Sequence, residues 1–384
     1  MAKLGDIATI QSGGTPARSI AEYWEDGTIP WVKISDIKSK HLNQTEEMIT
    51  EAGLENSSAK IFPKGTILYT IFATLGETSI LDINAATNQA IAGISITDSR
   101  VLPDYLYYYL LSQKIHVQKI GRGVAQNNIN MKLLRDFDVP LPSKEAQLNI
   151  IEQLNRVTEL LFLRKQQLTK LDELIKARFV EMFGDCRLNP KGWVTKNLDQ
   201  VADVGSSKRV FVEELQSEGI PFYRGTEVGA LAEGKSIRPE LFITEEHYKQ
   251  LCEATGKPQK GDLLMPSICP DGRIWVVDTD APFYFKDGRV LWVHLTSRNY
   301  NPIFLLYTLK DRIMTDYESI ASGTTFAELK IFALKKCRIF DVSLSLQNQF
   351  ADFVAEVDKS KVEVQKALDQ TQLLFDSLMQ QYFG

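Results

Sequence analysis

The sequence lacks the features that define several broad classes of protein. No run approaches the roughly eighteen consecutive apolar residues that cross a membrane, and the N-terminus has no apolar signal-peptide core. The four cysteines, Cys186, Cys252, Cys269 and Cys337, show no CxxC spacing. We therefore expect free thiols rather than a zinc site or a disulfide framework. These absences favour a cytoplasmic protein with no membrane partner.

Catalytic signatures are also missing. The sequence has no GxxxxGKS/T phosphate loop, no HExxH and no GxSxG. The four histidines show no metal-ligand spacing, and adjacent carboxylates such as Glu46 and Glu47 are typical of solvated loops. The acidic-Pro-Pro-aromatic signature of an amino-methyltransferase is absent too. We therefore predict no catalytic residue, no metal site and no cofactor in this chain.

Positive charge is also in short supply. The chain has 44 basic and 49 acidic residues, which gives a net charge of −5. Domains that bind nucleic acid through bulk electrostatics usually have a basic balance. The deficit counts mildly against binding DNA alone. It leaves room for local basic faces, or for a partner that supplies much of the phosphate contact.

Residues 145–184 form the most distinctive stretch that is present. They contain no proline and no glycine before the last residue, and they are rich in Leu, Gln, Glu and Lys, which lose little rotamer freedom in a helix. One helix of roughly 38 residues would be about 57 Å long, whereas an average helix has roughly 11 residues. A helix of this length needs a partner along its surface.

The apolar spacing indicates the kind of partner. Apolar residues recur at every seventh position of the stretch, which is typical of a coiled-coil seam. Residues 345–384 have the same register, displaced by two hundred positions, and both stretches end in Phe-Gly, a common C-terminal helix signal. The predicted seam residues are Leu154, Leu161, Leu168 and Ile175 in the first helix and Val354, Val357, Val364, Leu368 and Phe375 in the second.

Shorter motifs repeat as well. The strand-like residues 29–32 are echoed by 220–223, and the Lys-Gly turn and strand of 63–68 are echoed by 259–264. Matched strands and matched long helices imply an internal duplication. We predict an α+β protein with two mixed α/β domains related by this duplication and separated by two long antiparallel helices that form a coiled coil. The predicted bounds are 1–144 for the first domain, 145–184 for the central helix, 185–344 for the second domain and 345–384 for the C-terminal helix.

Polar side chains cluster in the loops that follow the matched strands. Asn and Gln can pair bidentately with adenine and Arg and Lys with guanine, while Ser and Thr can hold phosphates. Ordinary loop polarity explains any one of them, but their recurrence at equivalent places in both halves favours a DNA-reading surface. The candidates are Ser12, Thr15, Arg18, Lys33, Ser35, Lys38, Thr70, Thr74, Asn88, Gln89, Arg122, Gln126 and Asn127 in the first half and Ser207, Lys208, Arg209, Arg224, Thr226, Ser267, Lys286, Arg289, Thr324 and Thr325 in the second; the same loops also carry Asn128, Ser206, Glu227 and Asp287.

This duplicated order of strand, glycine turn, Ile-Pro-aromatic strand, Lys-Gly strand, polar loop and long helix resembles the specificity subunit of type I restriction–modification enzymes. The segment Val139-Pro140-Leu141-Pro142 resembles the family's junction between recognition domain and helix. Its second copy, residues 342–347, lacks the prolines. No single motif is diagnostic, and the duplicated arrangement over essentially the whole chain carries the resemblance.

The resemblance implies a non-catalytic subunit of an adenine-N6 DNA methyltransferase and type I restriction endonuclease complex. Two target recognition domains would each read one half of a bipartite, asymmetric sequence in double-stranded DNA. The helices would set the half-site spacing and dock two methyltransferase subunits, and restriction/translocase subunits would complete the complex. S-adenosylmethionine, ATP and magnesium would be bound by these partner subunits.

Two other hypotheses stay open. A coiled-coil adaptor could use its two domains to bind proteins or sugars, and a duplicated enzyme could carry an unrecognised site. Recovery of an adenine methyltransferase with the chain would favour the specificity subunit over the adaptor. Methylation by the chain alone would favour the enzyme.

Overall fold

The computed structural model describes residues 1–121, 128–323 and 327–384 and divides into two units with separate cores. The first unit comprises Met1–Gln166 and Gln365–Gly384, and the second comprises Gln167–Val364. Two helices of 40 residues each, α6 (Lys144–Phe183) and α11 (Leu344–Phe383), contribute a part to both units. The predicted long helices are therefore confirmed, and each begins and ends one residue earlier than predicted.

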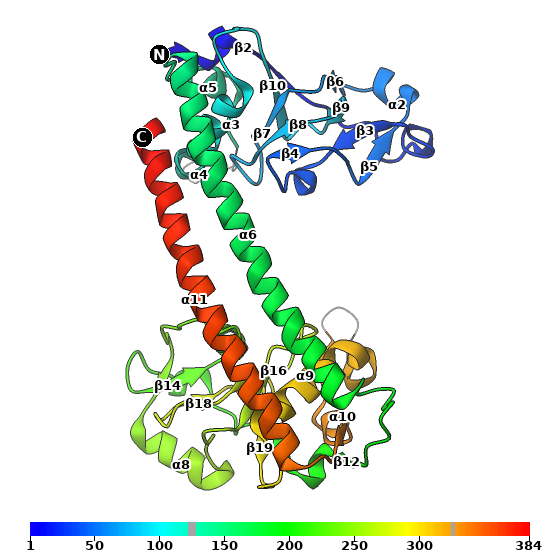
Figure 1. Cartoon of the computed structure of the whole chain (residues 1–384), viewed down its shortest axis with the longest axis vertical. Coiled ribbons are helices and arrows are strands. Elements are labelled where there is room, and N and C mark those ends of the chain that lie inside the picture. Colours follow the sequence, from blue (N-terminus) through cyan, green and yellow to red (C-terminus); the bar gives the residue numbers. More distant parts are fainter. Residues whose placement is uncertain (122–127, 324–326) are drawn as a thin grey trace. The chain divides into compact units, whose positions relative to one another are not determined.

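The first unit is built on two mixed sheets (Figure 1). The larger sheet has the order β2 (Ala8–Ser12), β10 (Ile91–Ile96), β7 (Ile67–Thr70), β8 (Thr78–Leu81) and β4 (His41–Leu42). The smaller sheet has the order β5 (Glu47–Ile49), β3 (Ile29–Val32), β9 (Ala85–Thr87) and β6 (Ile61–Phe62). The short strands β1 (Ala2–Lys3) and β11 (Asp138–Val139) pair separately. Their register brings the two ends of the domain together.

The helices of the first unit are α1 (Leu4–Ile7), α2 (Glu51–Glu55), α3 (Pro103–Ser112), α4 (Lys114–Gly121) and α5 (Met131–Arg135), with short 3-10 turns η1 (Ala21–Tyr23) and η2 (Ile34–Asp36). Helix α3 begins with proline, which is compatible with the first helical turn because its missing N–H is not needed there. Leu106 and Tyr108 of α3 are buried in the core formed with β7 and β10. Leu154 of α6 and Met379 of α11 join that core.

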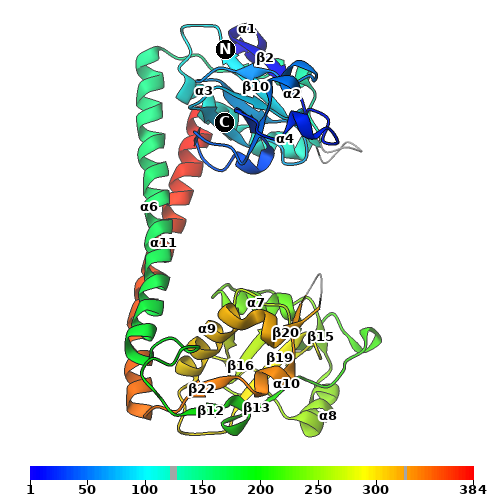
Figure 2. The ribbon, with the colours of Figure 1, turned by 90° about the vertical axis from the view of Figure 1, so that its right-hand side faces the viewer.

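The second unit repeats this plan. Its larger sheet has the order β13 (Ala202–Gly205), β19 (Val290–Leu295), β16 (Leu263–Pro266) and β17 (Trp275–Val276), and its smaller sheet β15 (Phe242–Ile243), β14 (Ile220–Tyr223) and β18 (Tyr284–Phe285). Two further pairs are β12 (Thr195–Asn197) with β22 (Arg338–Phe340) and β20 (Ala321–Ser322) with β21 (Glu328–Leu329). The helices are η3 (Leu198–Gln200), η4 (Val212–Glu214), α7 (Gly225–Ala232), α8 (Glu245–Thr255), α9 (Pro302–Ile320) and α10 (Ile331–Lys335). Helix α9 packs against the larger sheet (Figure 2).

The sheet topologies confirm the predicted duplication. The order β2-β10-β7-β8 in the first unit corresponds strand for strand to β13-β19-β16-β17 in the second. The order β5-β3-β9 corresponds to β15-β14-β18, and in both units the second of these pairings is parallel. Both units also end in a long helix preceded by a short helix and an edge strand. One framework therefore occurs twice, with different loops.

The two long helices pair antiparallel, as contacts within the second unit demonstrate. Asp172 of α6 forms an ion pair of 2.7 Å with Lys361 of α11. Phe179, which lies further along α6, packs edge-on against Phe350, which lies nearer the start of α11, with ring centroids 5.4 Å apart. In the first unit the Tyr382 hydroxyl donates to Gln153 Oε1 at 2.8 Å. Of the predicted seam residues, Leu154, Leu161, Ile175, Val354, Val357 and Val364 are buried, and Leu168, Leu368 and Phe375 are half-buried.

A buried glutamine near the start of each long helix joins that helix to its unit. Gln147 Oε1 accepts from the Leu102 amide at 3.0 Å, and its Nε2 donates to the Arg100 and Pro142 carbonyls at 2.9 and 3.0 Å. Gln347, two hundred positions later, makes the same three kinds of bond in the second unit. Both side chains are fully buried. The duplication therefore extends to hydrogen bonds that fix where each long helix begins.

Candidate nucleic-acid interface

Each unit places a basic residue at the same junction between a strand and a helix. Lys33 follows β3 and precedes η2, and Arg224 follows β14 and precedes α7. The backbone amide of each is capped by an acidic residue three positions later: Lys33 N donates to Asp36 Oδ2 at 2.9 Å, and Arg224 N donates to Glu227 Oε2 at 2.8 Å. This is the capping-box spacing, which fixes the first turn of a helix. Both basic side chains therefore leave the framework from a well-defined backbone.

In the first unit, carboxylates hold these cations. Lys33 Nζ lies 2.8 Å from Glu46 and 2.9 Å from Glu47, and these carboxylates raise the pKa of Lys33. The hydrogen bond from Lys33 lowers the pKa of Glu46, whereas hydrogen bonds from Arg18 and then from Lys33 lower the pKa of Glu47. Arg18 pairs with Glu47, and its guanidinium carbon lies 3.7 Å from the ring centroid of Trp24. Cation and aromatic plane stabilise one another in such an arrangement. The result is an ordered, mixed-charge face.

A second group of predicted residues lies in the turns beside β2 and β10. The Thr15 hydroxyl donates to Gln89, and the Asn88 carboxamide oxygen accepts from the Ala90 amide at 3.1 Å. Gln89 is exposed, and Thr15 and Asn88 are half-buried. The Thr15 and Gln89 side chains therefore meet although they are 74 positions apart in the sequence. The remaining predicted residues near β2 and β3 stay accessible: Ser12 is half-buried, and Ser35 and Lys38 are exposed.

Thr70 and Thr74 form a local structure. Thr70 is fully buried, and its hydroxyl donates to the Thr74 carbonyl and accepts from the Glu77 amide. Short hydroxyl side chains commonly satisfy neighbouring backbone groups in this way. Thr70 therefore shapes the loop between β7 and β8, whereas the Thr74 side chain is exposed on that loop.

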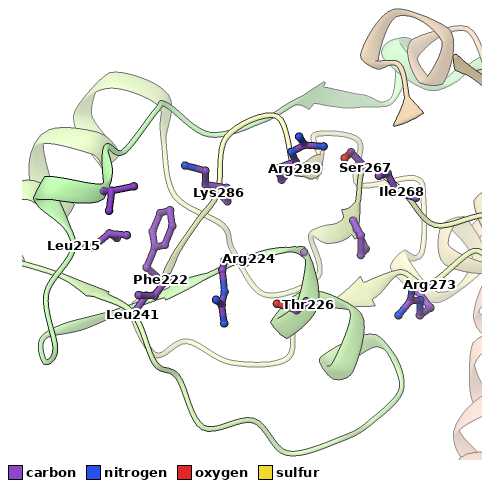
Figure 3. A pocket seen from close by; sticks show the side chains of 13 residues that line it. Leu215, Phe222, Arg224, Thr226, Leu241, Ser267, Ile268, Arg273, Lys286 and Arg289 are labelled. Atoms are coloured by element: carbon purple, nitrogen blue, oxygen red, sulfur yellow. The ribbon is translucent and has the colours of Figure 1, made fainter. Parts of the chain in front are cut away.

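The second unit brings five predicted residues together around one pocket. Arg224 and Thr226 come from the junction of β14 and α7, Ser267 from the end of β16, and Lys286 and Arg289 from the turn before β19 (Figure 3). The apolar part of the lining includes Leu215, Phe222, Leu241 and Ile268. Arg273, which the sequence did not single out, contributes a fourth cation. The sequence feature that could have pointed to Arg273 is the Asp271-Gly272 turn that directly precedes it.

Acidic groups hold the pocket cations as well. Arg289 pairs with Glu328, and Arg273 pairs with Asp271 at 2.8 Å. Lys286 Nζ lies 3.7 Å from Asp287 Oδ1. The pocket is therefore a set of oriented donors rather than a concentration of unbalanced positive charge, in agreement with the acidic composition of the chain.

Ser207, Lys208 and Arg209 lie in the loop after β13, next to the pocket turn. The Ser207 hydroxyl donates to the Phe285 carbonyl at 2.6 Å, and the Lys208 amide donates to the Tyr284 hydroxyl at 3.2 Å. The Ser207 hydroxyl therefore stabilises the loop by its bond to the backbone. The Lys208 and Arg209 side chains are exposed, and they extend the basic side of the surface.

Five of the predicted residues lie outside the described part of the chain: Arg122, Gln126, Asn127, Thr324 and Thr325. Among residues 1–121, 128–323 and 327–384, no group of three or more His, Cys, Asp or Glu side chains could hold a metal ion. Within the same ranges no helix is long and apolar enough to cross a membrane.

The fold and these two faces define a duplicated recognition protein, in which one framework presents two different sets of donors. The chain belongs to the family whose model is described as the type I restriction modification DNA specificity domain, which matches residues 1–173 and 190–371. The MjaIX type I restriction enzyme specificity subunit of Methanocaldococcus jannaschii is 26% identical over 401 residues, covering 98% of this chain and 90% of the relative.

Solved structures agree with this assignment at the level of the fold. A chain from a study of complex assembly and conformational transition of the type I restriction–modification system aligns with a TM-score of 0.59 and 18% identity, over 100% of this chain and 96% of that one. The specificity subunit from M. genitalium aligns with a TM-score of 0.51 and 16% identity, over 98% and 94%.

Proposed function

We propose that this chain gives a type I restriction–modification complex its DNA sequence specificity, with each unit reading one half of a bipartite, asymmetric sequence. The observation that supports this most directly is the contrast between equivalent positions on one framework. Where the first unit has Lys33 held by two glutamates, the second has Arg224. Side chains that contact base edges determine the sequence that a protein reads. Two equivalent but different reading surfaces therefore suit a target whose halves differ.

We further propose that α6 and α11 act as a spacer whose residue count sets the distance between the half-sites. A straight helix advances about 1.5 Å per residue, and paired helices bend less readily than single ones. The sequence between the half-sites would then be unread, and only its length would matter. Catalysis, S-adenosylmethionine, ATP and magnesium belong in this proposal to partner subunits.

Exposed apolar residues on the long helices support docking of such partners. In the first unit, Leu160, Leu163 and Leu374 are 45%, 48% and 49% exposed, and in the second Leu174 and Val362 are 47% and 52% exposed. Apolar groups that remain in solvent on a paired helix are typical of a further protein interface. We propose that the two methyltransferase subunits bind there.

One experiment separates this function from the coiled-coil adaptor and the duplicated enzyme. The chain is expressed in a methylation-deficient bacterium with and without a type I methyltransferase subunit from the same source, and methylated adenines are mapped across the genome. We expect a bipartite motif with a fixed spacer only when both genes are present. Methylation by the chain alone would favour the enzyme, and no chain-dependent methylation in either strain would favour the adaptor.

A further inference from the structure

The surroundings of Arg224 suggest a specific role within the proposed DNA-reading surface. Glu227 receives hydrogen bonds from four donor atoms: Arg224 Nε donates to both carboxylate oxygens at 3.2 Å, Arg224 Nη2 donates at 2.5 Å, the Arg224 amide at 2.8 Å, and the Thr226 hydroxyl at 2.9 Å. The Glu227 side chain is only 11% exposed. Glu240 accepts a further bond from Arg224 Nη2 at 3.1 Å. The guanidinium is therefore fixed along one edge.

The opposite edge of the guanidinium is available. Nη1 carries two N–H groups, and in the part of the chain that the structure describes no acceptor is recorded for it. The Arg224 side chain is 41% exposed and lines the pocket of the second unit (Figure 3). A side chain held in this way loses little conformational entropy when its remaining donors meet an acceptor.

The charges around Arg224 distinguish the two acceptors that DNA offers. One guanidinium facing two carboxylates has a local net charge of −1, so the group repels a phosphate at long range although it can still donate at short range. Phosphate contacts gain most of their free energy from unbalanced positive charge and counterion release. A guanine edge is uncharged and presents two acceptors, O6 and N7. The arrangement therefore favours a base edge.

We propose, resting on the proposed DNA-specificity function, that Arg224 reads a guanine edge in the second half-site and that Glu227 is its positioning residue. The first unit shows what is special here. Asp36 occupies the position equivalent to Glu227 and caps Lys33 N, but Lys33 Nζ contacts Glu46 and Glu47 instead. The second unit alone combines the cap and the side-chain clamp in one carboxylate.

In the test, the full-length chain selects binding sequences from a randomised duplex DNA library at low ionic strength. The bound DNA is sequenced, and its affinity is measured at several salt concentrations. Wild type, Glu227→Gln and Arg224→Lys are compared, with Asp36→Asn as the matched cap control. We expect Glu227→Gln and Arg224→Lys to lose about 5- to 150-fold discrimination at one base position of one half-site. The other half-site and the salt dependence should stay as in wild type, and Asp36→Asn should leave the whole motif intact.

Other outcomes would overturn the proposal. Weakening that is uniform across sequences, with a shallower salt dependence, would make Arg224 a phosphate contact. An unchanged motif in the Arg224→Lys variant would show that Arg224 does not contact the bases. If Asp36→Asn lost as much base discrimination in the first half-site as Glu227→Gln loses in the second, the effect would be due to the helix cap. Circular dichroism of each variant checks folding, and Glu246→Gln, at an exposed carboxylate of α8 that does not line the pocket, should retain the motif. Failure of the wild-type chain to select any bipartite motif would instead refute the proposed function itself.

Discussion

The glutamine at the start of each long helix gives a prediction whose size follows from its contacts. Gln147→Leu retains much of the side-chain volume but removes the groups that bond to the Leu102 amide and to the Arg100 and Pro142 carbonyls. A buried polar group left without a partner costs about 1–3 kcal/mol. Because these three backbone groups are only partly buried, water can reach some of them. We therefore expect a total loss of about 3 kcal/mol.

This loss is large enough to measure in two ways. For a unit of this size, about 1 kcal/mol shifts the melting temperature by about 2–4 °C, so Gln147→Leu should lower the melting temperature of the first unit by about 6–12 °C. Hydrogen exchange, followed by mass spectrometry, should accelerate at the start of α3 and of α6. Gln347→Leu should produce the same changes at the start of α9 and of α11, because its bonds are equivalent.

A control variant and a refuting result follow from the same geometry. Gln372 is an exposed glutamine on α11 whose side chain bonds to Asp376 on the same helix. Gln372→Leu should change stability by no more than about 0.5 kcal/mol. If Gln147→Leu were equally mild and left exchange at α3 unchanged, the buried glutamine would not be what attaches α6 to its unit.

Three further predictions concern the helices and the clamp. Leu154→Ala should destabilise the first unit by about 2–5 kcal/mol because its side chain is fully buried, while the exposed Leu160→Ala should be nearly neutral in chemical denaturation. Burial alone would raise the pKa of Glu227, but hydrogen bonds from Arg224 and Thr226 outweigh it and hold the pKa at about 2. This depressed pKa stabilises the fold above pH about 4.5, and the contribution is lost as the pH falls toward about 2. The Glu227→Gln variant should therefore show a flatter dependence of stability on pH in that range. Deleting residues 164–170 together with residues 364–370 keeps the heptad register and shortens each helix by about 10.5 Å. The mapped motif should then keep its half-sites and lose about 3 base pairs of spacer. An unchanged spacer would show that the helices do not set the distance between the half-sites.

The sequence predicted the framework well because the framework depends on periodic apolar residues. A seven-residue repeat carried by Leu154, Leu161 and Ile175 determines both the length of α6 and the face that it buries. The internal duplication followed from motifs that occur twice, and the matching sheet topologies of the two units confirm it. These features are local or repeated, so they can be recognised without any knowledge of which distant residues meet.

The polar surface was less predictable because the roles of polar residues depend on neighbours far away in the sequence. Ser207 and Thr70 were grouped with the reading residues, but their hydroxyls bond to nearby backbone. Arg273 was missed because the equivalent loop of the first half, between β7 and β8, carries no basic residue that would have drawn attention to it. Glu227 was noted only as a polar loop residue, although the spacing of a basic residue and an acidic residue three positions later, present in both halves, indicated a cap.

The held cations also reconcile the net charge of −5 with the proposed DNA-reading surface. On both faces cations such as Lys33, Arg224 and Arg289 meet at least one carboxylate, so these cations contribute little unbalanced charge to attract phosphates. What remains is directional hydrogen bonding, which is short-ranged and distinguishes one base edge from another. Such a surface should select sequence without binding DNA tightly, and affinity must then come from subunits that contact the phosphates. The chain alone should therefore show a clear motif at low salt and little affinity at physiological salt, whereas the assembled complex should retain the motif at both.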